Sequence, residues 1–242
     1  MDGPAWGRGL LPRLARVYNA AMIVVTGGAG FIGSCLVAGL ERAGASKVVV
    51  VDRLDHDAQR RNLSHRANLA AIVPPGALDD FLDRDGGHVE AVFHLGAISS
   101  TTETDEALLE RVNVGLSRTL WRFATARGVP FVYASSAATY GDGLEGFDDA
   151  FDGQYLRRLK PLNPYGASKH RFDLEVLRMV AGGEKTPPVW AGLKFFNVYG
   201  PNEYHKGGQR SVLTTHHFSK LPRVVVAGRG AEGRTGCAAD RA

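Results

Sequence analysis

The run from Thr26 to Gly33, Thr-Gly-Gly-Ala-Gly-Phe-Ile-Gly, constrains the fold of this chain more than any other feature. It joins a short apolar segment, 22–26, to a segment with apolar residues at helical spacing, 31–43. Its glycines at 27, 30 and 33 allow a tight turn, and they let the backbone approach a pyrophosphate at the helix N-terminus, which carries free N–H groups and partial positive charge. The run therefore favours a nucleotide-binding α/β fold.

The middle of the chain alternates between strand and helix patterns. Strands are expected at 22–26, 47–52, 89–94, 129–135 and 189–195, and helices at 31–43, more weakly over 67–84, and at 103–127 and 163–181. Four consecutive valines, 48–51, are typical of a strand that is buried on both faces. Repeated β-α-β units of this kind predict a doubly wound parallel sheet of the Rossmann type, whose ligands bind at the carboxyl ends of the strands.

Charge and composition exclude several classes of protein. The net charge of +4 comes from the ends, because residues 1–21 carry +2 and residues 206–242 carry +5, which leaves −3 for the patterned middle. A nucleic-acid partner is therefore not expected, since its binding face would be basic. No apolar run is long enough to cross a membrane. Two cysteines suffice for neither a disulfide framework nor a zinc site, and no metal is expected, so the prediction is a cytoplasmic protein.

The two ends differ from the middle in pattern. Residues 1–21 are predicted to be an extension outside the core, because Met22 directly precedes the first strand. Residues 22–212 form the predicted dinucleotide-binding domain. Residues 213–242 hold one short apolar run, 224–227, and are predicted to be an atypical tail.

A carboxylate follows the second predicted strand. Asp52 lies 19 residues beyond Gly33, where its oxygens can accept hydrogen bonds from an adenosine ribose. Arg53, the next residue, can neutralise a 2′-phosphate. The pattern predicts a dinucleotide site and leaves both NADP and NAD open.

A tyrosine and a lysine are spaced for one helical face. Tyr165 and Lys169 lie four residues apart, and Ser136 ends an earlier predicted strand. A nearby ammonium favours the phenolate form of a tyrosine and so makes it a usable acid/base group. Ser136 can donate a hydrogen bond to the same substrate oxygen. Together with the glycine turn, this set indicates an acid/base group beside a dinucleotide cofactor.

These motifs, with the run from His94 to Ala97 and with Asn113, resemble those of the extended short-chain dehydrogenases/reductases that modify nucleotide sugars. Four further strings, at 99–103, 134–141, 161–163 and 195–207, resemble the ADP-glyceromanno-heptose 6-epimerase family. The resemblance runs from Met22 to about Val212. It implies that the family's C-terminal substrate lobe is largely missing, and that the chain is truncated or out of frame after about Val212.

The resemblance also implies roles for individual residues. Tyr165 and Lys206 would be the two acid/base groups, and Lys169 would hold the nicotinamide ribose. The other implied cofactor contacts are Phe31, Ile32, Asp52, Leu95, Gly96, Ala97, Ile98, Ser99, Asn113 and Val198. Asn197 and Gly208, with Ser136, would contact the substrate.

The implied reaction is epimerisation at C6 of ADP-D-glycero-D-manno-heptose. It would pass through a transient ketone, use bound NADP with NAD as the alternative, and supply heptose for the lipopolysaccharide core. A homo-oligomer is expected for the full-length protein. A UDP-sugar 4-epimerase and an inactive dinucleotide-binding fragment remain as alternatives. A 4,6-dehydratase is disfavoured, because Ala137 and Ala138 stand where it needs an acidic pair.

Overall fold

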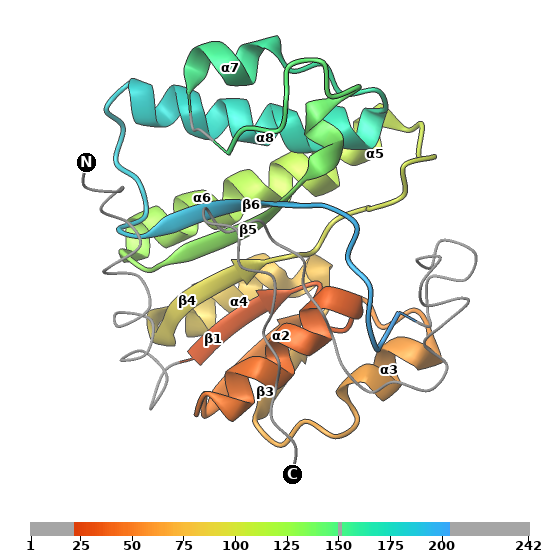
Figure 1. The fold of residues 1–242 in the computed structure, drawn as a ribbon. Coiled ribbons are helices and arrows are strands. Elements are labelled where there is room, and N and C mark those ends of the chain that lie inside the picture. Colours follow the sequence, from red (N-terminus) through yellow and green to blue (C-terminus); the bar gives the residue numbers. More distant parts are fainter. Residues whose placement is uncertain (1–21, 150–151, 204–242) are drawn as a thin grey trace, which may run out of the picture.

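The computed structural model describes residues 22–149 and 152–203. Its centre is a six-stranded sheet in the order β3-β2-β1-β4-β5-β6, in which every adjacent pair of strands is parallel (Figure 1). The strands are β1 (Met22–Thr26), β2 (Lys47–Val51), β3 (Leu69–Val73), β4 (Val89–His94), β5 (Phe131–Ser136) and β6 (Trp190–Phe195). The predicted doubly wound parallel sheet is therefore confirmed. The predicted extension 1–21 and tail 213–242 lie outside the described residues.

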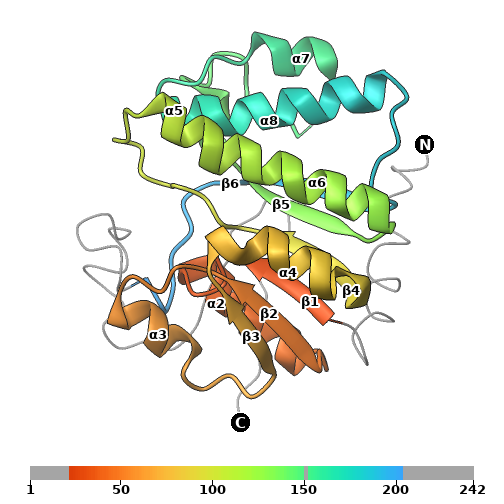
Figure 2. The same ribbon diagram turned by 180° about the vertical axis from the view of Figure 1, so that it is seen from behind.

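Helices cover the sheet on both sides. They are α2 (Phe31–Arg42), α3 (Asp57–Leu63), α4 (Leu78–Asp85), α5 (Glu106–Leu109), α6 (Leu116–Arg127), α7 (Gly153–Arg158) and α8 (Pro164–Ala181), with short turns η2 (Pro75–Ala77), η3 (Gly86–His88), the π-helical η4 (Glu110–Gly115) and η5 (Ala137–Tyr140). Helix α2 lies in front of the sheet in Figure 1, and α4 and α6 lie in front of it in Figure 2. None of the helices in the described part combines the length and apolar character that crossing a bilayer requires.

Two hydrophobic cores lie on opposite faces of the sheet. Because successive strand residues point to opposite faces, Val24 of β1 packs with residues of α4, α6 and α8, while Ile23 and Val25 pack with α2. In the described part of the chain, no residue of β5 or β6 joins the core beneath α2, and Leu193 of β6 is 42% exposed. The sheet is thus covered unequally on its two faces.

The prediction of helix over 67–84 is partly wrong. Residues Leu69–Val73 form β3 at one edge of the sheet, and the α-helix α4 begins only at Leu78, after the 3-10 turn η2. The sequence Leu-Ala-Ala-Ile-Val contains two alanines, which favour helix, but pairing with β2 decides the outcome. The short helix α3 was not predicted.

The predicted helix 103–127 is interrupted by a π-helical turn. The helical stretch begins at Glu106, where the Asp105 side chain accepts a hydrogen bond from Leu108 N, and η4 precedes α6. A π turn advances the chain differently from an α turn, so the inward face shifts along the sequence. On this stretch Trp121 is buried, whereas Val112 is only partly buried.

Candidate active site

The glycine turn packs against the end of β4. Gly27 has φ +67°, a backbone conformation that favours glycine, and a Cβ there would lie 2.7 Å from Gly96 N. A Cβ on Gly33 would lie 2.0 Å from Gly27 O. Helix α2 then begins after Gly30 with no side-chain cap. A backbone that tolerates no side chain at these points, followed by an uncapped helix N-terminus, is the cradle that a pyrophosphate fits.

The carboxylate predicted to hold the ribose lies beside this turn. Asp52 Oδ2 accepts a hydrogen bond from Ala29 N at 3.0 Å, and Oδ1 accepts one from Arg53 N at 2.8 Å. The Arg53 side chain is exposed and forms an ion pair with Asp55 at 3.1 Å. The structure therefore brings Asp52 next to the glycine turn and leaves Arg53 at the surface.

A buried hydrogen-bonded chain joins the carboxyl ends of β1 and β4. Gly96 N donates to Thr26 Oγ1 at 2.9 Å, and Thr26 Oγ1 lies 2.6 Å from His94 Nδ1. On the other side, His94 Nε2 lies 2.9 Å from Ser117 Oγ, whose hydroxyl donates to Asn113 O at 2.5 Å. Since Ser117 has already used its proton, His94 donates from Nε2 and accepts at Nδ1 from Thr26.

The imidazole ring of His94 is neutral. Burial lowers the pKa of His94 to about 3, and the positive charge of Lys169 adds to the effect. These hydrogen bonds thus fix Gly96 against the glycine turn without placing a charge there. Thr26 has a part in it that the sequence analysis did not assign, although its position directly before Gly27 was a signal.

Asn113 connects the loop after β4 to helix α8. Its Oδ1 accepts from Ile98 N at 2.8 Å, and its Nδ2 donates to Ile98 O at 3.0 Å and to Ser168 Oγ at 2.9 Å. Ser168 in turn donates to Tyr165 O at 2.7 Å. Around Ile98, residues 95–97 are partly buried and Ser99 is exposed. Asn113 therefore holds the loop 95–99 in a fixed position relative to Tyr165. This loop was predicted to line the cofactor.

The structure brings Tyr165, Lys169 and Ser136 together. Helix α8 starts at Pro164, where the Asn163 side chain accepts from Gly166 N at 2.7 Å, so Tyr165 lies in its first turn. Burial raises the pKa of the Tyr165 phenol, and a hydrogen bond with Ser136 opposes that rise. Lys169 Nζ donates to Ala134 O of β5 at 2.9 Å. Burial lowers the pKa of Lys169 to about 8.

The remaining predicted site residues are less closely placed. Phe31 is buried and Ile32 partly buried at the start of α2, beside the cradle. Asn197 and Val198 follow β6, where Asn197 is exposed and Val198 is partly buried. Lys206 and Gly208 lie outside the described residues.

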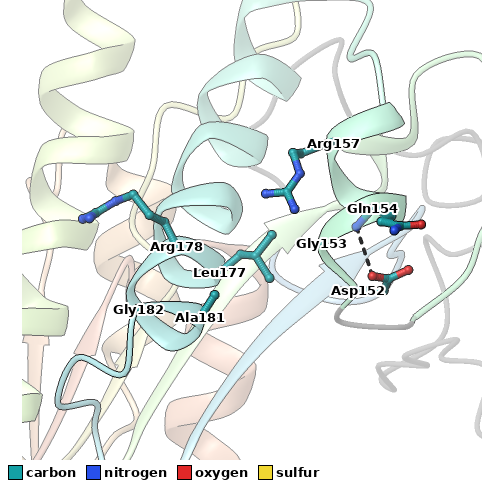
Figure 3. A pocket seen from close by; sticks show the side chains of 8 residues that line it. All are labelled: Asp152, Gly153, Gln154, Arg157, Leu177, Arg178, Ala181 and Gly182. Atoms are coloured by element: carbon teal, nitrogen blue, oxygen red, sulfur yellow. Dashed lines mark hydrogen bonds between the residues drawn. The ribbon is translucent and has the colours of Figure 1, made fainter.

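A pocket of about 580 Å³ lies between α7 and the C-terminal end of α8 (Figure 3). Tyr165 lies in the first turn of α8, at the opposite end of that helix. Its lining residues are Asp152, Gly153, Gln154, Arg157, Leu177, Arg178, Ala181 and Gly182. None of them is a predicted site residue. The pocket therefore contains none of the residues to which the sequence analysis assigned a role.

Comparisons with known proteins agree with this geometry. Residues 23–235 match the NAD dependent epimerase/dehydratase family, which extends the likeness beyond Val212. The chain is 47% identical to an ADP-L-glycero-D-manno-heptose-6-epimerase of Nitratidesulfovibrio vulgaris over 79% of its length and 58% of that protein. It is 44% identical to one of Alkalilimnicola ehrlichii over 90% of its length and 65% of that protein.

A solved structure of another such epimerase is also similar to this chain. The crystal structure of ADP-L-glycero-D-manno-heptose-6-epimerase of Helicobacter pylori superposes with a TM-score of 0.66 at 28% identity, covering 82% of this chain and 62% of that one. The chain thus spans about three fifths of the length of these relatives. With the parallel sheet, the glycine cradle and the matched family profile, the chain belongs to the NAD dependent epimerase/dehydratase family.

Proposed function

We propose that this chain is the cofactor-binding and catalytic part of an enzyme that inverts C6 of the heptose in ADP-D-glycero-D-manno-heptose to give the L-glycero epimer. The observation that carries the proposal is the meeting of Tyr165, Lys169 and Ser136 at the carboxyl end of β5, on the same edge of the sheet as the glycine cradle. The names of the curated relatives support the substrate. They do not favour the UDP-sugar 4-epimerase alternative.

The chain's own residues fit a dinucleotide cofactor. The glycine turn and the start of α2 would take the pyrophosphate, Asp52 the adenosine ribose and Lys169 the nicotinamide ribose. A bound nicotinamide dinucleotide supplies the hydride acceptor and donor for the reaction. We propose NADP, with NAD as the alternative, because the exposed Arg53 is free to turn toward a 2′-phosphate at the cost of one surface ion pair with Asp55.

Tyr165 is proposed to hold and move the proton of the C6 hydroxyl. Burial keeps its phenol protonated in this structure, so the group needs positive charge nearby to act as a base. Lys169, one helical turn away, carries that charge, and Ser136 donates to the same region. Inversion also requires a group on the opposite side of the carbon, and we propose Lys206 for it. In the cell, we propose a cytoplasmic homo-oligomer that supplies heptose for lipopolysaccharide.

The test uses a full-length enzyme that contains this domain, assayed for epimerisation of ADP-heptose. Tyr165→Phe and Lys206→Met are each expected to lower turnover by about 10²–10⁴-fold while dinucleotide binding is retained. Lys169→Met is expected to weaken dinucleotide binding as well. Normal turnover in Tyr165→Phe would overturn the proposed function, and normal turnover in Lys206→Met would remove Lys206 from it.

A further inference from the structure

We propose that the ion pair between the buried Asp173 and the partly buried Lys194 is a positioning element for Tyr165 and Lys169, which sets the charge that Lys169 experiences and holds the end of β5 against α8. Neither residue touches the predicted cofactor cradle, and the sequence analysis assigned neither a role. The inference rests on the proposed function in one respect: that function names Tyr165 and Lys169 as the acting groups.

The first observation is a shared helical face. Tyr165, Lys169 and Asp173 follow one another at intervals of four residues on α8, so they form one stripe toward β5. Asp173 is 3% exposed and Lys169 is 6% exposed. Asp173 Oδ1 accepts from Tyr133 OH at 2.9 Å, and its Oδ2 accepts from Ser135 Oγ at 2.7 Å. Four consecutive residues of β5, 133–136, are thus bonded to this stripe.

The second observation is a cation supplied by the neighbouring strand. Lys194 of β6 is the register partner of Ser135, and its Nζ lies 2.7 Å from Asp173 Oδ2. The same ammonium donates to Thr139 Oγ1 at 2.7 Å and lies 5.2 Å above the Tyr140 ring. Thr139 donates to Ser136 O at 2.8 Å. The pair therefore reaches the residue that bonds to Tyr165.

Stability alone does not account for such a pair. Buried ion pairs are replaced by well-packed apolar residues with little or no loss of stability, since desolvation of the two charges offsets their attraction. Breaking one partner is different, because the remaining charge is left buried and uncompensated. The position of the pair, one turn beyond Lys169, gives it a second effect.

That effect is electrostatic. The charged or titratable groups that interact with Lys169 are the neutral His94 from β4 and Asp173 from α8. Asp173 in turn faces Tyr133 of β5, Lys194 of β6 and His170. Burial lowers the pKa of Lys169 to about 8, and the Asp173 carboxylate opposes that decrease. Without the carboxylate, Lys169 would lose its proton nearer to neutral pH. A neutral amine would no longer favour the Tyr165 phenolate.

The test measures Lys169 directly in the 242-residue chain. The sequence contains seven lysines, so ¹³C-lysine labelling gives a small set of NMR signals, and the Lys169 signal is identified by its loss in Lys169→Arg. Its pKa is then followed by titration in Asp173→Asn, Lys194→Met and Lys194→Arg. Glu175→Gln is the matched control, because Glu175 lies on the same helix but pairs outward with Arg118.

The expected signs are opposite for the two partners. Asp173→Asn lowers the pKa of Lys169 by about one unit, a tenfold loss of proton affinity, whereas Lys194→Met raises it. Lys194→Arg and Glu175→Gln leave it unchanged. A variant that merely loosened the packing would admit water and raise the pKa in Asp173→Asn, so an unchanged or raised value there overturns the proposal.

Two further outcomes are decisive. If Asp173→Asn fails to fold by circular dichroism, the lysine variants remain, and an unchanged Lys169 pKa in Lys194→Met overturns the proposal. Because the titration needs no turnover, its failure is distinct from failure of the proposed epimerisation, which the Tyr165→Phe assay measures.

Discussion

Replacing Gly33 with alanine is expected to destabilise the fold, although alanine is the better helix former. Gly33 lies in the first turn of α2, and a Cβ there would be 2.0 Å from Gly27 O, 2.8 Å from Gly27 C and 2.8 Å from Gly28 Cα. All three are backbone atoms of the tight turn. They cannot rotate away as a flexible side chain would.

The size of the effect follows from these contacts. Carbon atoms pack at about 3.5–4.0 Å, so turn and helix must separate by on the order of 1 Å or more, and overpacking of this kind costs about 1–3 kcal/mol. The movement also weakens the 3.1 Å hydrogen bond from Gly30 N to Gly27 O, a further ~1 kcal/mol. Better helix propensity returns about 1 kcal/mol. We expect a net loss of about 1–3 kcal/mol.

Gly39→Ala is the matched control in the same helix. A Cβ at Gly39 would meet no atom within 4 Å, so only the helix propensity changes, and stability rises by up to about 1 kcal/mol. Urea unfolding of the two variants should therefore give midpoints about 0.5–2 M apart, for an m-value of about 2 kcal/mol/M. Equal midpoints would refute the argument that the turn excludes a side chain at position 33.

Two other predictions concern the buried polar groups. His94 has a pKa of about 3 in the folded chain and about 6.5 when unfolded, so its contribution is complete above pH 6.5 and is lost toward pH 3 at about 1.4 kcal/mol per unit. Urea midpoints measured from pH 7 to 5 should fall less in His94→Asn than in the parent chain. Parallel curves would show that His94 is not the origin of the pH dependence of stability. Asn113→Ala removes the side-chain hydrogen bonds to Ile98 and Ser168 and is expected to lower the free energy of unfolding by about 2–4 kcal/mol. Arg118→Ala, which breaks partly exposed ion pairs, is expected to lower it by about 1 kcal/mol or less, and equal losses in the two variants would contradict the argument.

Much of the fold was predictable because its signals are local. Continuous apolar runs mark β1 and β2, and a shorter one, 91–93, marks β4. The glycine turn fixes where β1 ends and α2 begins. The edge strand β3 was missed because it is only partly buried and contains helix-favouring alanines, so pairing with β2 outweighs local preference. The π-helical turn within the 106–127 stretch was not predicted, because a π turn leaves no periodic trace.

Part of the site was not predictable for a different reason. The spacing of Tyr165 and Lys169 is local, but the partners of Asp173 come from strands that are distant in sequence. A carboxylate at the next turn after Lys169 was a visible signal. That its cation would be Lys194 depends on the register of β6 against β5, which a single sequence does not contain.

The order of strands in the sheet also determines how the chain can assemble during synthesis. β2 and β3 extend the sheet outward on one side of β1, and the other side of β1 stays unpaired until β4 has been made, more than sixty residues later. From then on β4, β5 and β6 are added in the order of the sequence, each to the edge left by the one before. Such long-range parallel pairings form slowly, and the strand edges stay exposed until the pairing strand is in place. The central strand, although it is made first, therefore gains its second neighbour only after both strands on its other side are complete.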